Sequence, residues 1–140
     1  YSKVLFPKLI FSLVISFVGI VATSIVFGIF AKLSVWQIIM CIIFVYGLYS
    51  GHLFWSAELD IMNPQNEQYA TSGNEETNPN ETKSTVFAFI ISALATIISL
   101  LLFIENINVA WFKLMLIGLI FSVTRIYLYF DKIKLYYKEK

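Results

Sequence analysis

The chain has 140 residues, of which 59% are hydrophobic and 14% are charged, and its mean hydropathy is +0.77. About a quarter of the residues of a soluble globular domain are charged, and so small a domain could not cover the apolar surface of 17% aromatic residues. An ordinary soluble domain is therefore excluded. The net charge of +1 argues against nucleic-acid binding, which requires a concentrated basic patch.

Two uncharged runs, at residues 9–31 and 35–57, occupy the first part of the chain. Each is longer than the roughly 20 residues that cross a bilayer, so we expect two transmembrane helices joined by a tight turn at 32–34. In the second run Gly47 and Gly51 form a GxxxG pair, which predicts a face for close helix packing. A stripe of small residues at helical spacing predicts the same for the first run: Ser12, Ser16, Gly19 and Thr23.

A polar connector at residues 58–84 follows, with six acidic side chains and one lysine. Such a segment must lie outside the hydrocarbon, where water or a partner satisfies its backbone. Two Asn-Pro pairs within it, Asn63-Pro64 and Asn78-Pro79, are typical of helix starts, with asparagine as the N-cap and proline at the first helical position. The first pair predicts a short helix at about 64–72, and the second predicts a helix that continues into the third span.

The third and fourth spans are expected at residues 85–104 and 109–130. Small residues again predict packing faces, at Ser92 in the third span and at Gly118 in the fourth. Arg125 is the most costly group within the spans, and an ionisable residue there is by default a functional hypothesis. The alternative, which we favour, is that its long stem carries the charge to the nearby interface. The fold class that follows is all-α: a polytopic membrane protein with four transmembrane helices and a short cytoplasmic helix between the second and third.

Four spans place both termini and the connector on one side of the membrane. Lysines concentrate in the terminal segments, at positions 3, 8, 132, 134, 138 and 140. Positive charge collects on the cytoplasmic side, so we expect the termini and the connector to be cytoplasmic. The acidic connector is no strong objection, because Asp and Glu count little in that rule.

Candidate chemistry is confined to His52, Glu58 and Asp60, near the end of the second span. His52 and Glu58 are six residues apart, which places them on different faces of a helix. We therefore favour an ordinary histidine bonded to water or to a backbone carbonyl over a metal or catalytic site. The chain has no phosphate-binding loop, HExxH or GxSxG motif. No catalytic, cofactor-binding or metal-binding residue is predicted, and we do not expect an enzyme.

The connector carries a specific series of short motifs, with AELD at 57–60, NPQ at 63–65, QYA at 68–70 and NPNE, then a basic residue and Ser, at 78–84. This series resembles a segment of the large integral-membrane permeases of bacterial ABC-2-type exporters, especially those of low-GC Gram-positive bacteria. In that family a similar run precedes an apolar span near the C-terminal end. In the spans the resemblance is only compositional. It implies that the chain is the last four spans of a longer permease.

The resemblance further implies export across the bacterial cytoplasmic membrane, driven by a separate cytosolic ABC-type ATPase that contacts the connector. Oligomers with other permease parts are also expected. The residues expected to contact the ATPase are Glu58, Asp60, Ile61, Met62, Asn63, Pro64, Gln65 and Tyr69. Two other hypotheses stay open. One is a self-contained four-span protein that assembles through its small-residue faces, with a structural or regulatory role. The other is a membrane enzyme that uses His52, Glu58 and Asp60.

Overall fold

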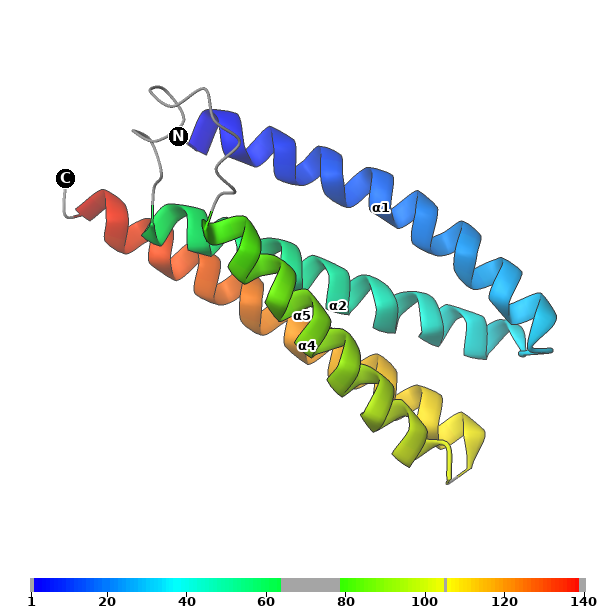
Figure 1. Ribbon diagram of the computed structural model, residues 1–140. Coiled ribbons are helices and arrows are strands. Elements are labelled where there is room, and N and C mark those ends of the chain that lie inside the picture. Colours follow the sequence, from blue (N-terminus) through cyan, green and yellow to red (C-terminus); the bar gives the residue numbers. More distant parts are fainter. Residues whose placement is uncertain (1, 64–78, 105, 139–140) are drawn as a thin grey trace.

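The computed structural model describes residues 2–63, 79–104 and 106–138, with side chains at 6–63, 79–104 and 106–134. Over these residues the chain forms four long helices (Figure 1), namely α1 (Ser2–Phe30), α2 (Val35–Met62), α4 (Pro79–Leu102) and α5 (Ile107–Lys138). All four are long and apolar enough to cross a membrane. The prediction of an all-α membrane protein with four transmembrane helices is confirmed. The short helix predicted at 64–72 lies outside the described residues.

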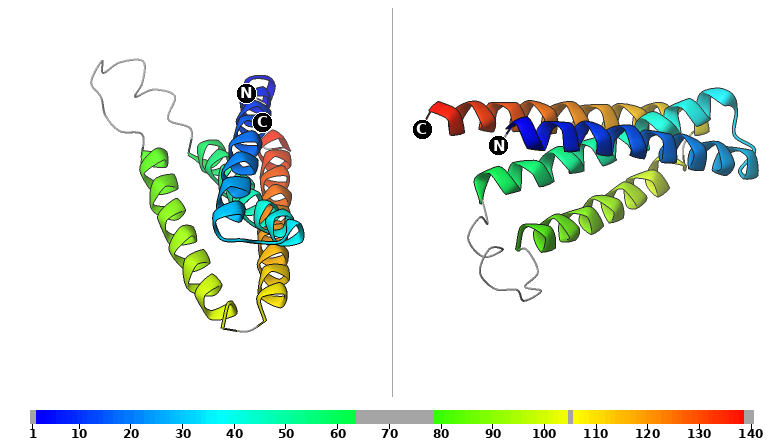
Figure 2. Two further views of the ribbon diagram at one scale, coloured as in Figure 1. Left: turned by 90° about the vertical axis from the view of Figure 1, so that its right-hand side faces the viewer. Right: turned by 90° about the horizontal axis from the view of Figure 1, so that it is seen from above.

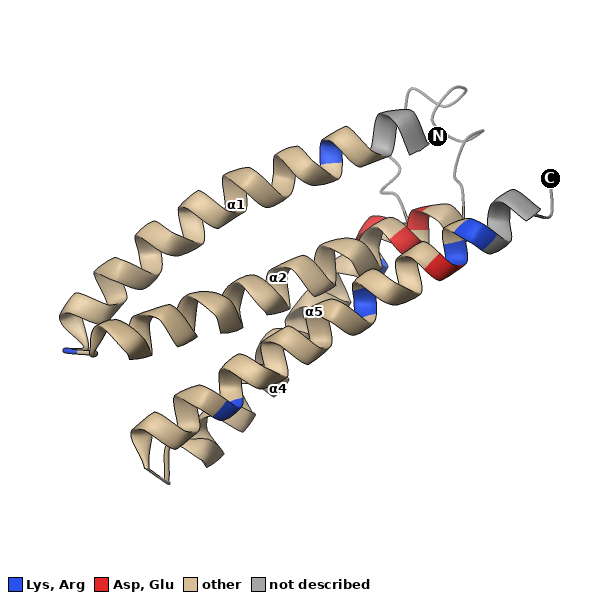
Figure 3. Cartoon of the chain, turned by 180° about the vertical axis from the view of Figure 1, so that it is seen from behind, with Lys and Arg blue, Asp and Glu red and all other residues tan. Residues whose placement is uncertain are grey.

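Successive helices run in opposite directions, so the start of α1, the end of α2, the start of α4 and the end of α5 share one end of the bundle (Figure 1). We call this the connector end, and the opposite end, with the two short turns, the turn end. The largest interface joins α2 to α5. In both views of Figure 2, α4 lies to one side of the other three helices. The four acidic residues with described side chains, Glu58, Asp60, Glu81 and Asp131, all lie at the connector end (Figure 3).

Two helices extend further than the apolar runs suggested. The α2 helix continues to Met62, where the Asn63 N–H still bonds to the Leu59 carbonyl at 2.9 Å. The first residues of the predicted connector, 58–62, therefore belong to the α2 helix. The α5 helix likewise runs to Lys138 instead of ending near residue 130. The predicted helix start at Pro79 is confirmed.

The tight turn predicted at 32–34 is also confirmed. Leu33 donates its N–H to the Gly28 carbonyl at 2.9 Å and Lys32 donates to the Ile29 carbonyl at 3.3 Å, which is the Schellman pattern of helix termination. Lys32 adopts φ 54°, a left-handed position where glycine is the usual residue. Ser34 then caps α2, since its side chain accepts from the Gln37 N–H while the Gln37 side chain accepts from the Ser34 N–H.

Glycine allows α2 and α5 to pack with their backbones in contact. A Cβ atom added to Gly47 would lie 2.5 Å from the Gly118 carbonyl oxygen, and one added to Gly118 would lie 2.7 Å from the Phe44 carbonyl oxygen. One turn on from Gly47, Gly51 accommodates the ring of Phe121. Ser92 differs from these glycines because it is exposed, and its carbonyl accepts from Thr96 of its own helix. The close packing predicted for Ser92 is therefore not found within the described chain.

Two hydrophobic clusters hold the bundle together, one at each end. The connector-end cluster is formed by Leu9, Phe54, Ala57, Ile61 and Tyr129, so that it joins α1, α2 and α5. The turn-end cluster is formed by Cys41, Phe44, Trp111 and Leu114, and Ala95, Ile98 and Leu102 bring the far half of α4 against it. The α4 helix thus packs on the bundle near its C-terminal end, and its other attachment lies at the connector end.

Candidate functional site

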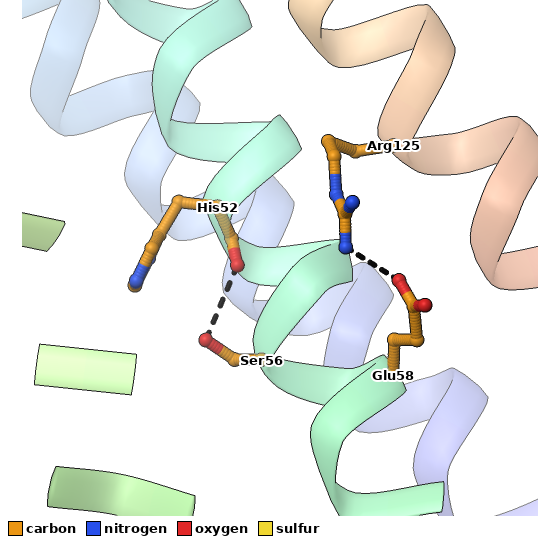
Figure 4. Close-up of polar contacts among 4 residues, drawn as sticks. All are labelled: His52, Ser56, Glu58 and Arg125. Carbon is orange, nitrogen blue, oxygen red and sulfur yellow. Dashed lines mark hydrogen bonds and ion pairs between the residues drawn. The ribbon is translucent and has the colours of Figure 1, made fainter. Parts of the chain in front are cut away.

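The last turns of α2 carry polar side chains on two opposite faces. His52, Ser56 and Asp60 recur at four-residue spacing and therefore share the face that points to α4. Glu58 points the other way, to α5, as Figure 4 shows. His52 and Glu58 therefore lie on different faces of α2, as predicted. The polar groups that the sequence places close together therefore act in two different helix interfaces.

On the α5 side, the Arg125 guanidinium donates from Nη2 to Glu58 Oε2 at 2.5 Å (Figure 4). The two side chains are only 15% and 10% exposed. The guanidinium carbon also lies 4.5 Å from the centre of the Trp55 ring, a cation–π arrangement. Arg125 therefore reaches a carboxylate near the connector end of α2 and forms an ion pair between α2 and α5. This partner was not predicted from the sequence.

On the α4 side, the imidazole of His52 lies 2.9 Å from the backbone carbonyl oxygen of Ser84. A carbonyl oxygen only accepts, so Nε2 carries the proton in this contact. The Ser56 and Ser84 hydroxyl groups also bond to each other, and Ser56 donates to the His52 carbonyl in its own helix. The interpretation of His52 as a histidine bonded to a backbone carbonyl agrees with this geometry.

Nearer the connector, Asn80 joins α4 to α2. Its side-chain amide donates to the Asn63 carbonyl at 2.8 Å and to Asp60 Oδ1 at 3.2 Å. Asn80 is only 3% exposed, although the residues on either side of it in the sequence are exposed. We call these contacts, together with the Ser84 contacts to His52 and Ser56, the α2–α4 clasp.

A hollow of about 300 Å³ lies beside the clasp, and its lining is unusually polar for this chain. It is lined by Ser56, Asp60, Asn80, Glu81, Ser84 and Thr85. Within residues 2–63, 79–104 and 106–138, no group of three or more His, Cys, Asp and Glu is placed to hold a metal ion. The contacts that the structure shows beside this hollow are hydrogen bonds between α2 and α4.

The residues expected to contact an ATPase divide into three groups. Glu58 and Ile61 are buried, the first on Arg125 and the second in the connector-end cluster, so neither is available to a partner. Asp60 and the Asn63 carbonyl accept from Asn80, whereas Met62 is 55% exposed. Pro64, Gln65 and Tyr69 lie outside the described residues.

Two features of this site were not predicted from the sequence. An arginine inside a span needs a counter-ion, and Glu58 is one of few carboxylates near the same end, so that partner could have been proposed. The clasp residues Asn80 and Ser84 gave no such signal, because polar residues at a helix start usually face water.

The fold and this site define a multi-pass helical membrane protein in which α4 is attached to an α2–α5 pair. No protein-family model, curated protein or solved structure matches the chain. Any more specific function therefore depends on the residues and their contacts.

Proposed function

We propose that the chain is the membrane-spanning part of an ATP-driven exporter, coupled to a separate cytosolic ATPase through the connector. The proposal starts from the motifs between residues 57 and 84, which resemble those of ABC-2-type permeases. It places the protein in the bacterial cytoplasmic membrane with its connector end facing the cytosol, where the ATPase would be.

The observation that most supports coupling is the α2–α4 clasp. Residues 64–78 join α2 to α4. Asn80, which follows this segment, donates hydrogen bonds to Asp60 and to the Asn63 carbonyl, which precede it. A force applied to the connector would therefore act first on these hydrogen bonds. Each net hydrogen bond contributes only about 1 kcal/mol, which is small compared with the free energy of ATP binding to a partner.

The packing of the four helices suggests what such a force would move. The α2 and α5 helices are joined through Gly47, Gly118 and the Glu58–Arg125 ion pair, so they would move as one body. The α4 helix buries no residue in its most apolar window. Opening the clasp would thus change the angle of α4 against a rigid pair, which is a movement suited to opening and closing a path across the membrane.

Site-specific cross-linking in membranes of the native host tests the proposal. A photoreactive amino acid at Met62, which is exposed at the connector end, should capture an ATP-binding protein. The matched control is the same amino acid at Ile107, which is 47% exposed at the turn end and would lie across the membrane from the ATPase. Capture from neither position, or equal capture from both, would argue against coupling through the connector.

A self-contained interaction protein is the second candidate, and one observation favours it. A Cβ atom added to Gly19 would meet nothing within 4 Å, and Thr23 is exposed, so this half of the small-residue stripe of α1 is open to another helix. The same photoreactive amino acid at Val18, which is 64% exposed, tests this candidate. Capture of a second copy of the chain at Val18, with no ATPase captured at Met62, would favour assembly over export.

A further inference from the structure

A hollow of about 320 Å³ lies within the membrane-spanning region between α1, α2 and α5. Its walls are apolar, and three helices contribute to them: Leu13 and Phe17 of α1, Ile42 and Ile43 of α2, and Leu119 and Ile126 of α5. This volume is within the range of small-molecule binding sites in proteins. We propose that the hollow binds one acyl chain of a phospholipid.

The hollow is maintained because α1 is fixed to the bundle on both sides of it. Towards the connector end, Leu9 is buried in the cluster with Phe54 and Tyr129. Towards the turn end, Gly28 lies so close to Ile38 that an added Cβ would overlap that side chain. Leu13 and Phe17 lie between these two contacts along α1. The helix therefore cannot close the space without losing packing at one end.

The two serines that line the hollow are already hydrogen-bonded. Ser50 donates to the Gly47 carbonyl at 3.2 Å, so the Ser122 hydroxyl donates in the 2.7 Å contact with Ser50. The Tyr46 ring packs edge-on against Phe17 at 5.3 Å between centroids. An ordered water needs two to four polar partners, which these serines do not leave available. An apolar occupant is favoured over water or a polar ligand.

The length of the hollow matches that of a lipid acyl chain in one leaflet of the bilayer. The α2 residues that line the hollow run from Ile42 to Phe54, which is about 18 Å at 1.5 Å per residue. One leaflet contributes about 15 Å of hydrocarbon, half of a core about 30 Å thick. Phe54 lies three residues before Ala57, where the uncharged run of α2 ends. An acyl chain of this length would therefore lie along α2 between the connector-end cluster and the middle of the bilayer.

Lysines on α1 and α5 lie at the end of the bundle where a lipid headgroup would be. The two helices that flank α2 around the hollow carry Lys8 on α1 and Lys132 and Lys134 on α5, against a single acid, Asp131. Arg125 does not add to this excess, because it is paired with Glu58. Lysines near a membrane surface attract the phosphate groups of lipids. The lysines of these two helices would therefore attract the phosphate of a lipid whose acyl chain occupies the hollow.

Native mass spectrometry of the full chain with dipalmitoyl phosphatidylglycerol tests the inference. After exchange into a delipidating detergent, the wild-type chain should retain one lipid. Leu13→Trp fills the hollow and should reduce the retained fraction about tenfold. Val14→Trp is the control, since it places the same bulk on the neighbouring position, which is 57% exposed, and should retain the lipid. Ile126→Trp fills the hollow from α5 and replaces Leu13→Trp if that variant does not fold.

Headgroup variants separate acyl-chain binding from surface attraction. Lys8→Gln with Lys132→Gln should weaken retention, but less than the tryptophan that fills the hollow. No lipid retained by the wild type, or equal retention by Leu13→Trp, Ile126→Trp and Val14→Trp, would overturn the inference. So would loss of retention in the lysine variants alone, because the lipid would then be held by its headgroup only.

Discussion

Glu58 and Arg125 are 67 positions apart in the sequence, yet their side chains form an ion pair between α2 and α5 that is largely shielded from solvent. Such a pair has a free-energy cost when it forms and a larger one when a single partner is removed. Forming it requires desolvation of two charges, whereas removing one partner leaves the other charge buried and uncompensated.

Arg125→Leu should therefore lower the free energy of unfolding by about 3–5 kcal/mol, which is the range for breaking a buried pair. Replacing both members, with Glu58→Met and Arg125→Leu together, should restore most of that stability, because neither charge is then buried alone. Denaturant unfolding in detergent micelles measures both variants. If Arg125→Leu alone is as stable as the wild type, Glu58 must be hydrated when its partner is absent.

Gly118→Ala should separate α2 from α5. The added methyl group would lie 2.7 Å from the Phe44 carbonyl oxygen, and backbone atoms cannot rotate away as a side chain can. We expect a loss of at least the 1–3 kcal/mol that is typical of overpacking, measured as a lower unfolding midpoint. Gly19→Ala is the matched control, because its methyl group meets nothing and alanine favours helix. Equal effects of the two substitutions would contradict close packing at Gly118.

Lys32→Gly should stabilise the protein by about 1 kcal/mol, because the left-handed conformation of Lys32 is unfavourable for any residue with a Cβ. Lys32→Ala removes the same charge without relieving that conformation, so it should not stabilise. Thermal unfolding of the two variants side by side measures the difference. If alanine and glycine have the same effect, the change comes from the charge and not from the backbone.

Asn80→Ala should loosen α4 at the connector end, since it removes the hydrogen bonds to Asp60 and to the Asn63 carbonyl. Loss of buried hydrogen bonds of this kind costs about 1–3 kcal/mol. Spin labels at Met62 and Thr85 should report a broader distance distribution. Thr82→Ala, at an exposed position of the same turn, should leave the distribution unchanged. An unchanged distribution in Asn80→Ala would remove the clasp from the coupling proposal.

Cysteine labelling tests which end of the bundle faces the cytosol. The native Cys41 is buried and should react little. In intact cells an impermeant reagent should label Asn106→Cys, which lies at the turn end, and should not label Asn74→Cys in the connector. The reverse pattern would invert the proposed topology.

The sequence by itself was sufficient for the number of spans and for several local features. Uncharged runs long enough to cross the bilayer predict helices because the backbone has no other partner in lipid, and this does not depend on how the helices pack. The turn after Ala31 and the helix start at Pro79 follow in the same way, because both are fixed by residues within a few positions.

Only the tertiary structure decided which polar groups meet. The pairing of Arg125 with Glu58 depends on the rotation and crossing of α2 and α5, which Gly47 and Gly118 set by close approach. Ile61 is buried for the same reason, since Leu9 and Tyr129 of other helices cover it. Hydropathy predicts that a residue lies in a helix. Which neighbour it contacts depends on the packing of helices distant in sequence, and hydropathy carries no information about that packing.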